Sequence, residues 1–113
     1  MIHNCEIKST RLGCGDNGIF MCWLFLEGDG FVAGFGRYAL DKWDESLKKR
    51  VMTAKGFQAI QEILNTLEID TWEKLPGTFI RADFDGWLGT CTRIGHLMKD
   101  RWFSFKDFFA EEK

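Results

Sequence analysis

The chain has 113 residues and a formal net charge of −2, and 45% of its residues are hydrophobic. A chain of this length can form one domain, residues 1–113, with its own hydrophobic core and without a stabilising metal or disulfide. The weak net charge argues against a protein held on duplex DNA or on an anionic membrane by a general electrostatic field.

Aromatic residues make up 15% of the chain and include 11 Phe and 5 Trp. This is more ring surface than so short a chain can easily bury. We therefore expect some rings to lie at a subunit interface or in a ligand pocket, where aromatic side chains are enriched. An aromatic-rich core is the alternative for any single ring.

The cysteines and histidines do not form a metal-binding pattern. Neither CxxC nor a mixed Cys/His spacing occurs among Cys5, Cys14, Cys22, Cys91, His3 and His96. We expect reduced thiols, no metal, no cofactor and a cytoplasmic location. No apolar stretch is long enough to span a membrane, so we expect no membrane partner.

The N-terminal segment predicts a strand followed by a glycine-rich loop. Apolar and polar residues alternate from Met1 to Lys8, which is typical of a strand. Residues 9–18 then contain three glycines together with Asp16 and Asn17, which favour turns. The free N–H groups of such a loop can bind an anion. A plain connection is the simpler interpretation.

The segment from Gly18 to Asp41 predicts a long hairpin, and the rest of the chain is expected to be arranged around it. Eight apolar residues, Ile19–Leu26, lead to a turn at residues 27–30 and an aromatic-rich return strand. A strand that is apolar on both faces must be covered on both. We expect a helix on one face and a second sheet or another subunit on the other.

A charged stretch and the main helix come next. Residues 41–50 are interpreted as solvated surface, with phosphate contact through Lys48-Lys49-Arg50 as the alternative. From Thr53, a suitable N-cap, apolar residues recur at helical spacing. We expect the hairpin to be covered by the stripe that they form, namely Phe57, Ile60, Ile63, Leu64 and Leu67.

The last third of the chain predicts a capped helical turn at 70–73, a second hairpin with strands 78–84 and 90–97, and a terminal helix opened by Ser104 and Asp107. Trp87 lies at the tip of the second hairpin, where its ring could stack on a nucleobase or pack on a neighbouring subunit. The fold class is therefore α+β, with antiparallel β-hairpins, one main helix packed on the sheet and a short C-terminal helix.

The motifs of common enzyme classes are missing from the sequence, which contains no GxSxG, Walker phosphate loop or HExxH. We therefore expect a binding protein rather than an enzyme. Basic residues do occur beside aromatic rings: Arg37 next to Tyr38, His96 near Lys99, and Arg101 next to Trp102. A guanidinium can bind phosphate and a ring can stack on a base, a combination that suits a nucleotide.

Nearly the whole chain resembles a widespread group of small bacteriophage proteins close to the phage anti-Thoeris sponge family. The segments that carry the resemblance are IKSTRLG (7–13), GFGRYALD (34–41), TAKGFQAIQEIL (53–64), TWEKLPG (71–77) and RIGHLMKDRWF (93–103). The resemblance implies a protein of the infected bacterial cytoplasm that binds cyclic ADP-ribose immune signals, or cyclic oligonucleotides, without cleaving them. It also implies a homo-oligomer, from a dimer up to a hexamer.

The resemblance further implies ligand sites in recesses between subunits. Arg37, Lys99 and Arg101 are then the phosphate candidates, and Trp87 or Trp102 is the stacking candidate. The loop with Asp16 and Asn17 would form a second anion-binding edge, although a GxxDHG pattern expected in this group is replaced by Asp16-Asn17-Gly18.

Two other functions remain open from the sequence. The order of strands and helix also fits an OB-like module for single-stranded nucleic acid, although the net charge makes nucleic acid an unlikely partner. A protein-blocking inhibitor of the anti-CRISPR type is the third hypothesis.

Overall fold

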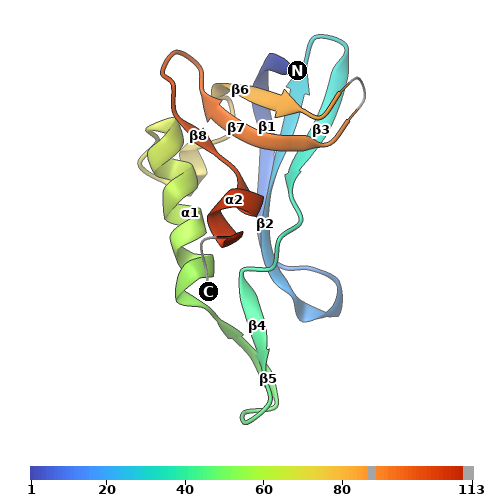
Figure 1. The fold of residues 1–113 in the computed structure, drawn as a ribbon, viewed down its shortest axis with the longest axis vertical. Helices are drawn as coiled ribbons and strands as arrows, with labels where there is room; N and C mark the ends of the chain where they lie inside the picture. The colour runs from blue at the N-terminus through green and yellow to red at the C-terminus, as the bar shows by residue number, and fades with distance from the viewer. Residues whose placement is uncertain (87–88, 111–113) are drawn as a thin grey trace.

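The computed structural model describes residues 1–86 and 89–110. Within them an antiparallel sheet of six strands has the order β3-β2-β1-β6-β7-β8. Its strands are β1 (Ile2–Cys14), β2 (Phe20–Gly28), β3 (Phe31–Gly36), β6 (Phe79–Phe84), β7 (Cys91–His96) and β8 (Trp102–Phe103). The sheet curls, because β3 contacts β7 although three strands separate them in the sheet order (Figure 1).

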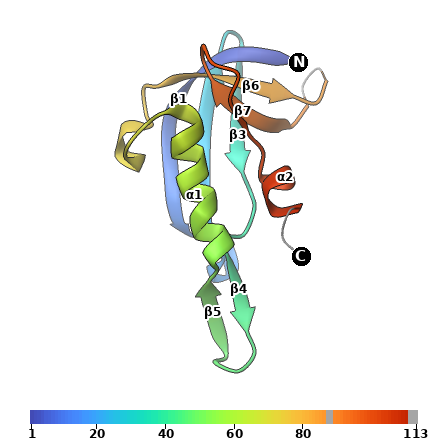
Figure 2. The same cartoon turned by 60° about the vertical axis from the view of Figure 1, so that its left-hand side comes forward.

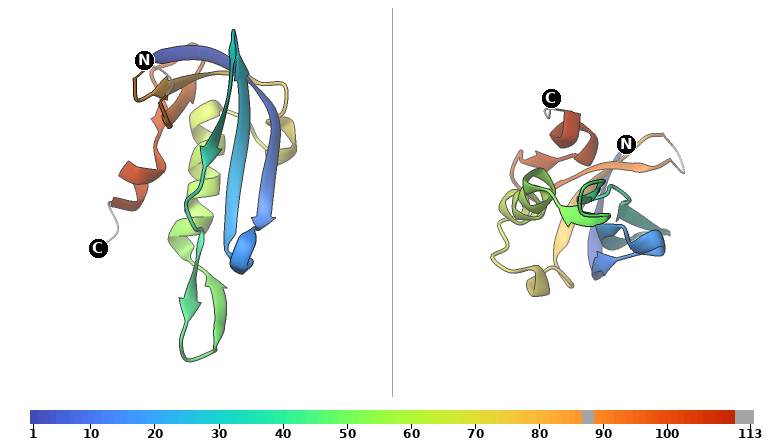
Figure 3. Two further views of the ribbon diagram at one scale, coloured as in Figure 1. Left: turned by 90° about the vertical axis from the view of Figure 1, so that its right-hand side faces the viewer. Right: turned by 90° about the horizontal axis from the view of Figure 1, so that it is seen from below.

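The remaining elements lie against this sheet or project from it. Helix α1 (Ala54–Leu67) lies alongside the sheet, and the short helix α2 (Phe105–Ala110) follows β8 (Figure 2). Two single 3-10 turns, η1 (Asp16–Gly18) and η2 (Trp72–Lys74), occupy connections. A separate two-stranded sheet, β4 (Asp41–Asp44) with β5 (Lys49–Met52), extends away from the rest (Figure 3). The predicted α+β class is confirmed.

The predicted central hairpin is confirmed, but only one of its faces is covered. Cys22, Leu24 and Leu26 of β2 point into the single cluster of buried hydrophobic residues. On the opposite face Phe25 is 40% exposed, and Trp23 stacks on it with the two rings 9° from parallel. The second sheet expected on this face is therefore absent from the described residues, and coverage by another subunit stays a prediction.

The predicted helix is confirmed together with its cap, but its buried face is rotated. Thr53 Oγ1 accepts a hydrogen bond from the Gly56 N–H at 2.8 Å. Gly56 packs so closely on the backbone of Leu40 that a Cβ atom there would overlap the Leu40 carbonyl. This close approach buries the side of the helix that carries Ala59, Ile63 and Leu67. The prediction for Phe57 was wrong, since it is 66% exposed.

Two segments expected to be irregular are strands. The loop prediction for residues 9–14 was wrong, because β1 continues to Cys14 and pairs with β2 as far as Phe20 after a bulge between Ile7 and Ser9. The charged stretch 41–50 contributes β4 and the first half of β5. Its base is fixed by Asp41, which receives hydrogen bonds from the Arg50 guanidinium at 2.8 and 2.9 Å and from the Phe20 N–H at 3.1 Å.

The C-terminal predictions are largely confirmed. The second hairpin is β6 and β7, and α2 begins after Ser104, whose Oγ accepts from the Asp107 N–H at 3.3 Å. The helical turn after Asp70 is present as η2, but no side chain caps it. Neither helix of the described part is long and apolar enough to cross a membrane.

Asp41→Asn should destabilise the protein by roughly 2 kcal/mol at pH 7, because it breaks a nearly buried charged pair and leaves Arg50 without its partner. The hydrogen bonds from Arg50 hold the pKa of Asp41 below its usual value. The stabilisation is therefore complete above about pH 4 and is lost as the pH falls further. Urea denaturation across this range tests it. Equal destabilisation by Asp29→Asn, an exposed turn residue, would contradict the account.

The four cysteines should differ sharply in reactivity. Burial raises the pKa of Cys5 to about 11 and those of Cys22 and Cys91 to about 12, whereas Cys14 is exposed. Since the thiolate is the reactive form, a thiol reagent such as DTNB should titrate one group rapidly in the native protein and all four in denaturant. Cys14→Ser should abolish the rapid phase. A rapid phase that survives this substitution would show that a buried thiol is accessible.

Candidate functional site

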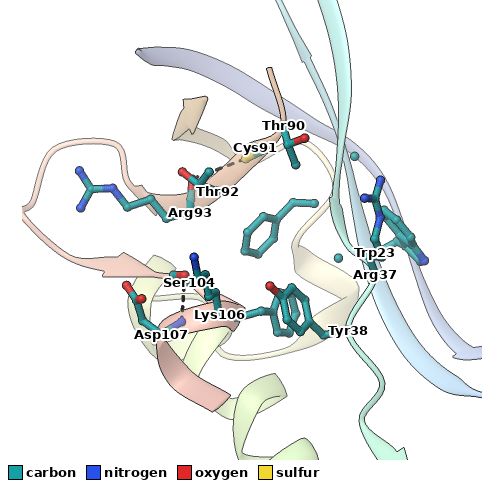
Figure 4. Close-up of a pocket in the computed structure, with 14 residues that line it drawn as sticks. Trp23, Arg37, Tyr38, Thr90, Cys91, Thr92, Arg93, Ser104, Lys106 and Asp107 are labelled. Atoms are coloured by element: carbon teal, nitrogen blue, oxygen red, sulfur yellow. Dashed lines mark hydrogen bonds between the residues drawn. The ribbon is translucent and has the colours of Figure 1, made fainter. Parts of the chain in front are cut away.

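A recess with several polar residues in its lining lies where β3 and β7 approach each other. Its volume is about 480 Å³. The end of β3, the segment that leads into β7, and α2 supply its walls (Figure 4). The lining consists of Trp23, Gly34, Phe35, Gly36, Arg37, Tyr38, Thr90, Cys91, Thr92, Arg93, Ser104, Phe105, Lys106 and Asp107.

The β3 wall is shaped by two glycines that lie under Trp23. A Cβ atom on Gly36 would come within 2.9 Å of the Trp23 ring, and one on Gly34 within 3.2 Å. The chain then leaves the strand through Arg37, whose φ of 82° lies in the left-handed region that side chains disfavour. Such strain is held by the surrounding structure and occurs often at functional sites.

Two cations on different walls of the recess have no internal partner. Arg37 and Lys106 are both exposed, and neither makes a side-chain hydrogen bond or ion pair with the described residues. Figure 4 shows Arg37 on the β3 side and Lys106 rising from α2. Asp107 is the one carboxylate in the lining. The recess therefore carries a net positive charge.

Aromatic packing fixes the floor of the recess. Tyr38 stacks on Phe105, with ring centroids 5.3 Å apart and planes 17° from parallel. Phe105 in turn stacks on Phe35 at 5.1 Å. Tyr38 is still 39% exposed, so part of the residue remains accessible. A rigid, partly exposed ring of this kind can serve as a stacking surface.

Arg93 also lines the recess, but its guanidinium contacts Asp83 and Trp102. Its Nε donates to Asp83 Oδ2 at 2.9 Å, and its guanidinium lies 4.1 Å from the centre of the Trp102 ring. Figure 4 shows the side chain pointing away from Arg37 and Lys106. Arg93 therefore stabilises the outside of the sheet.

Three of the residues predicted for the site form a different cluster, around Glu68. Lys99 Nζ and Arg101 Nη1 donate to Glu68 Oε2 at 2.7 and 2.8 Å. His96 Nε2 is 3.9 Å from Glu68 Oε1, and its Nδ1 accepts the N–H groups of Met98 and Lys99. The hydrogen bonds from Lys99 and then Arg101 lower the pKa of Glu68. One carboxylate thus pairs with both cations, and the three side chains together keep a net charge of +1.

Trp102 does not contact Glu68, but it too is engaged within the chain. Its ring lies over Gly95, where a Cβ atom would be 2.6 Å away, and Arg81 and Arg93 both approach it. Its Nε1 donates to Asp100 at 3.1 Å. These contacts show a structural role, and stacking on a ligand stays a prediction.

The other predicted residues belong neither to the recess nor to the cluster around Glu68. Asp16 and Asn17 form η1 at the turn between β1 and β2, where Asn17 adopts a φ of 64°, and they do not line the recess. Trp87 lies outside the described residues. Arg37 is therefore the one predicted residue that the structure places in the recess.

Sequence reasoning missed Lys106 and the threonines at positions 90 and 92. No local signal marks Lys106, since it lies 69 positions after Arg37 and reaches the recess only because α2 packs on Tyr38. In the described part of the chain no cluster of His, Cys, Asp and Glu could hold a metal ion.

The fold and the recess define a small α+β protein with a basic, aromatic-walled recess. Comparisons with protein-family models, with curated proteins and with solved structures find no match.

Proposed function

We propose that the chain is a phage anti-defence protein that binds a cyclic nucleotide signal in the recess between β3, β7 and α2 and sequesters it without cleaving it. The observation that carries the proposal is that Arg37 and Lys106, two cations without a partner among the described residues, line the same recess as the partly exposed Tyr38. The class of ligand, the lack of cleavage and the homo-oligomer rest on the sequence resemblance.

The charges support a ligand with more than one phosphate. Arg37 offers several N–H donors in a planar fork, which suits the oxygens of a phosphate, and Lys106 offers a point charge. Arg37 lies beside Trp23 on the β3 side and Lys106 on α2, so the two cations could contact different phosphates of one ligand. The strained backbone of Arg37 supports a role that stability alone does not explain.

The remaining lining supports a ligand that also contains a flat ring and hydroxyl groups. Tyr38 offers a ring edge and a phenol, and Thr90 is exposed at the β7 side. The volume of about 480 Å³ lies in the range that small-molecule sites occupy. A cyclic dinucleotide or a cyclic ADP-ribose isomer combines these features.

Calorimetric titration with cyclic ADP-ribose isomers and with cyclic di- and trinucleotides tests the proposal. Arg37→Ala and Lys106→Ala should each weaken binding by roughly 10- to 100-fold, because each removes a charged hydrogen bond worth about 1.5–3 kcal/mol. Lys42→Ala, which removes an exposed cation outside the recess, is the matched control and should bind normally. Mass spectrometry should recover the bound ligand intact.

The proposal fails if none of these compounds binds, or if both recess variants bind as tightly as the native protein. Salt-dependent retention on oligothymidine without binding of cyclic nucleotides would instead favour the single-stranded nucleic-acid module.

Arg37→Gly separates binding from folding. Glycine adopts a φ of 82° without strain, so this variant should be more stable than the native protein by about 1 kcal/mol while losing ligand affinity. Thermal unfolding and calorimetry on the same sample check both effects. A less stable variant would show that the Arg37 side chain makes a stabilising contact in the native protein.

A further inference from the structure

The face of β2 opposite the core carries two aromatic rings that lie side by side. The rings of Trp23 and Phe25 are 9° from parallel, with centroids 6.1 Å apart. A Cβ atom on Gly34 would lie 3.2 Å from the Trp23 ring and 4.0 Å from the Phe25 ring. Both rings therefore reach the same glycine and lie next to each other over β3. These two rings are here called the platform.

The strand register explains why the platform is flat. Trp23 pairs with Gly36 and Phe25 with Gly34 on β3, and directly opposed residues of an antiparallel pair lie on the same face. On the other side of β2, Phe25 pairs with Ser9, which is also small. Because glycine has no side chain, the rings can lie on the backbone of β3 instead of standing between neighbouring side chains.

One side of the platform remains uncovered. Phe25 is 40% exposed, and the half-buried Trp23 has its covered side against the glycines. Among the described residues no further ring stacks on Trp23, and no cation lies over it. Tyr38, in contrast, already stacks on Phe105 and Phe109. Trp23 is therefore better placed than Tyr38 to stack on a planar group.

The platform is continuous with the recess proposed for the ligand. Trp23 lines that recess together with Arg37 and Lys106. Figure 4 shows the Arg37 side chain beside Trp23. A guanidinium without an internal partner next to an uncovered ring can bind a phosphate and the base that is attached to it.

The charges on this face also favour an anionic ligand near Trp23. Arg11 is exposed and opposes Trp23 from β1, so cations flank this ring on both sides, Arg11 on β1 and Arg37 on β3. The carboxylates of the face, Glu6 and Glu27, oppose each other beyond Phe25. Both already pair with Lys8 Nζ, at 3.6 and 3.7 Å.

Two adjacent rings favour a purine over a pyrimidine. A purine has two fused rings, so it can overlap both Trp23 and Phe25, whereas the single ring of a pyrimidine overlaps only one of them. Stacking strength is one source of base preference at sites that read bases through their faces. The platform therefore favours signals that carry adenine or guanine.

We propose that the platform is the base subsite of the recess, where a purine of the cyclic nucleotide stacks on Trp23 and Phe25 while a phosphate contacts Arg37. This inference rests on the proposed function and adds a choice of ligand to it. Signals that contain purines are bound in preference to signals that contain pyrimidines and have the same phosphates. Trp23 is then a specificity-determining residue.

Calorimetry with two cyclic dinucleotides that share their phosphates tests the base subsite. The native protein should bind cyclic di-AMP roughly 10-fold more tightly than cyclic di-UMP, because the larger base stacks better. Trp23→Leu should reduce this ratio to about 2-fold or less, whereas Arg37→Ala should weaken both compounds and leave the ratio unchanged. Trp43→Leu, which removes an exposed ring outside the recess, is the matched control and should keep the native ratio.

Two further variants keep the test independent of folding. Trp23→Phe retains a ring over the glycines and should give a ratio between those of the native protein and Trp23→Leu. Phe25→Leu changes a residue that is 40% exposed and should also lower the ratio. Thermal unfolding of each variant shows whether it is folded under the conditions of the titration.

The indole N–H of Trp23 gives a direct reading of contact. Its resonance in the nuclear magnetic resonance spectrum is the one that Trp23→Phe lacks. Saturating cyclic di-AMP should shift this resonance through the ring current of the stacked base and should leave the Trp43 resonance in place. A ligand-induced shift at Trp43 with none at Trp23 would contradict the base subsite.

The outcomes separate this inference from the proposed function. Equal affinity of the native protein for both dinucleotides, or a preference for cyclic di-AMP that survives in both Trp23→Leu and Phe25→Leu, would overturn the inference alone, because a ligand still binds. If only a cyclic ADP-ribose isomer binds, Trp23→Leu should weaken it roughly 10-fold, and unchanged affinity would overturn the inference. If none of these compounds binds, the proposed function fails and the inference fails with it.

Discussion

The close contact between α1 and the backbone of Leu40 is the constraint on which the rest of the structure depends. Leu40 is fully buried, its N–H donates to the Phe20 carbonyl at 2.8 Å, and its carbonyl accepts the Thr53 hydroxyl at 3.1 Å. Gly56 provides the space that lets the helix approach. One residue thus joins the central hairpin, the β4–β5 hairpin and the helix.

This junction has consequences on both of its sides. Toward the N-terminus it fixes the short segment after β3, so Arg37 is held in a conformation that a free chain would avoid. Toward the C-terminus it determines which side of α1 is buried, and Phe57 is left on the uncovered side. The conformation of Arg37 at the recess and the exposure of Phe57 therefore both follow from the way in which α1 packs on Leu40.

Much of the fold could be predicted from the sequence, because local signals agree with the tertiary structure. The apolar run of β2, the glycine turn after it, and the Thr53 cap each specify an element without help from distant residues. The extension of β1 to Cys14 could not be predicted, since its glycine and polar residues are strand only through pairing with β2. The β4–β5 hairpin was not predicted, because a charged stretch such as residues 41–50 is typical of solvated surface.

The candidate site was predictable only in part. Arg37 was identified because an arginine followed by an aromatic residue is visible in the sequence itself. Whether a cation is free or paired depends on tertiary contacts. This distinguishes Arg37 from Lys99 and Arg101, which both pair with Glu68. The position of Lys106 in the recess and the exposure of Phe57 depend on how α2 and α1 pack against the sheet, which no local pattern in the sequence specifies.

The most direct test of the central claim is a nuclear magnetic resonance titration of the labelled protein with a cyclic ADP-ribose isomer. If the ligand binds in the recess, the largest amide shifts should occur at Gly36, Arg37 and Lys106, which line it. Shifts confined to the Glu68 cluster of Lys99 and Arg101, with none at the end of β3, would contradict it.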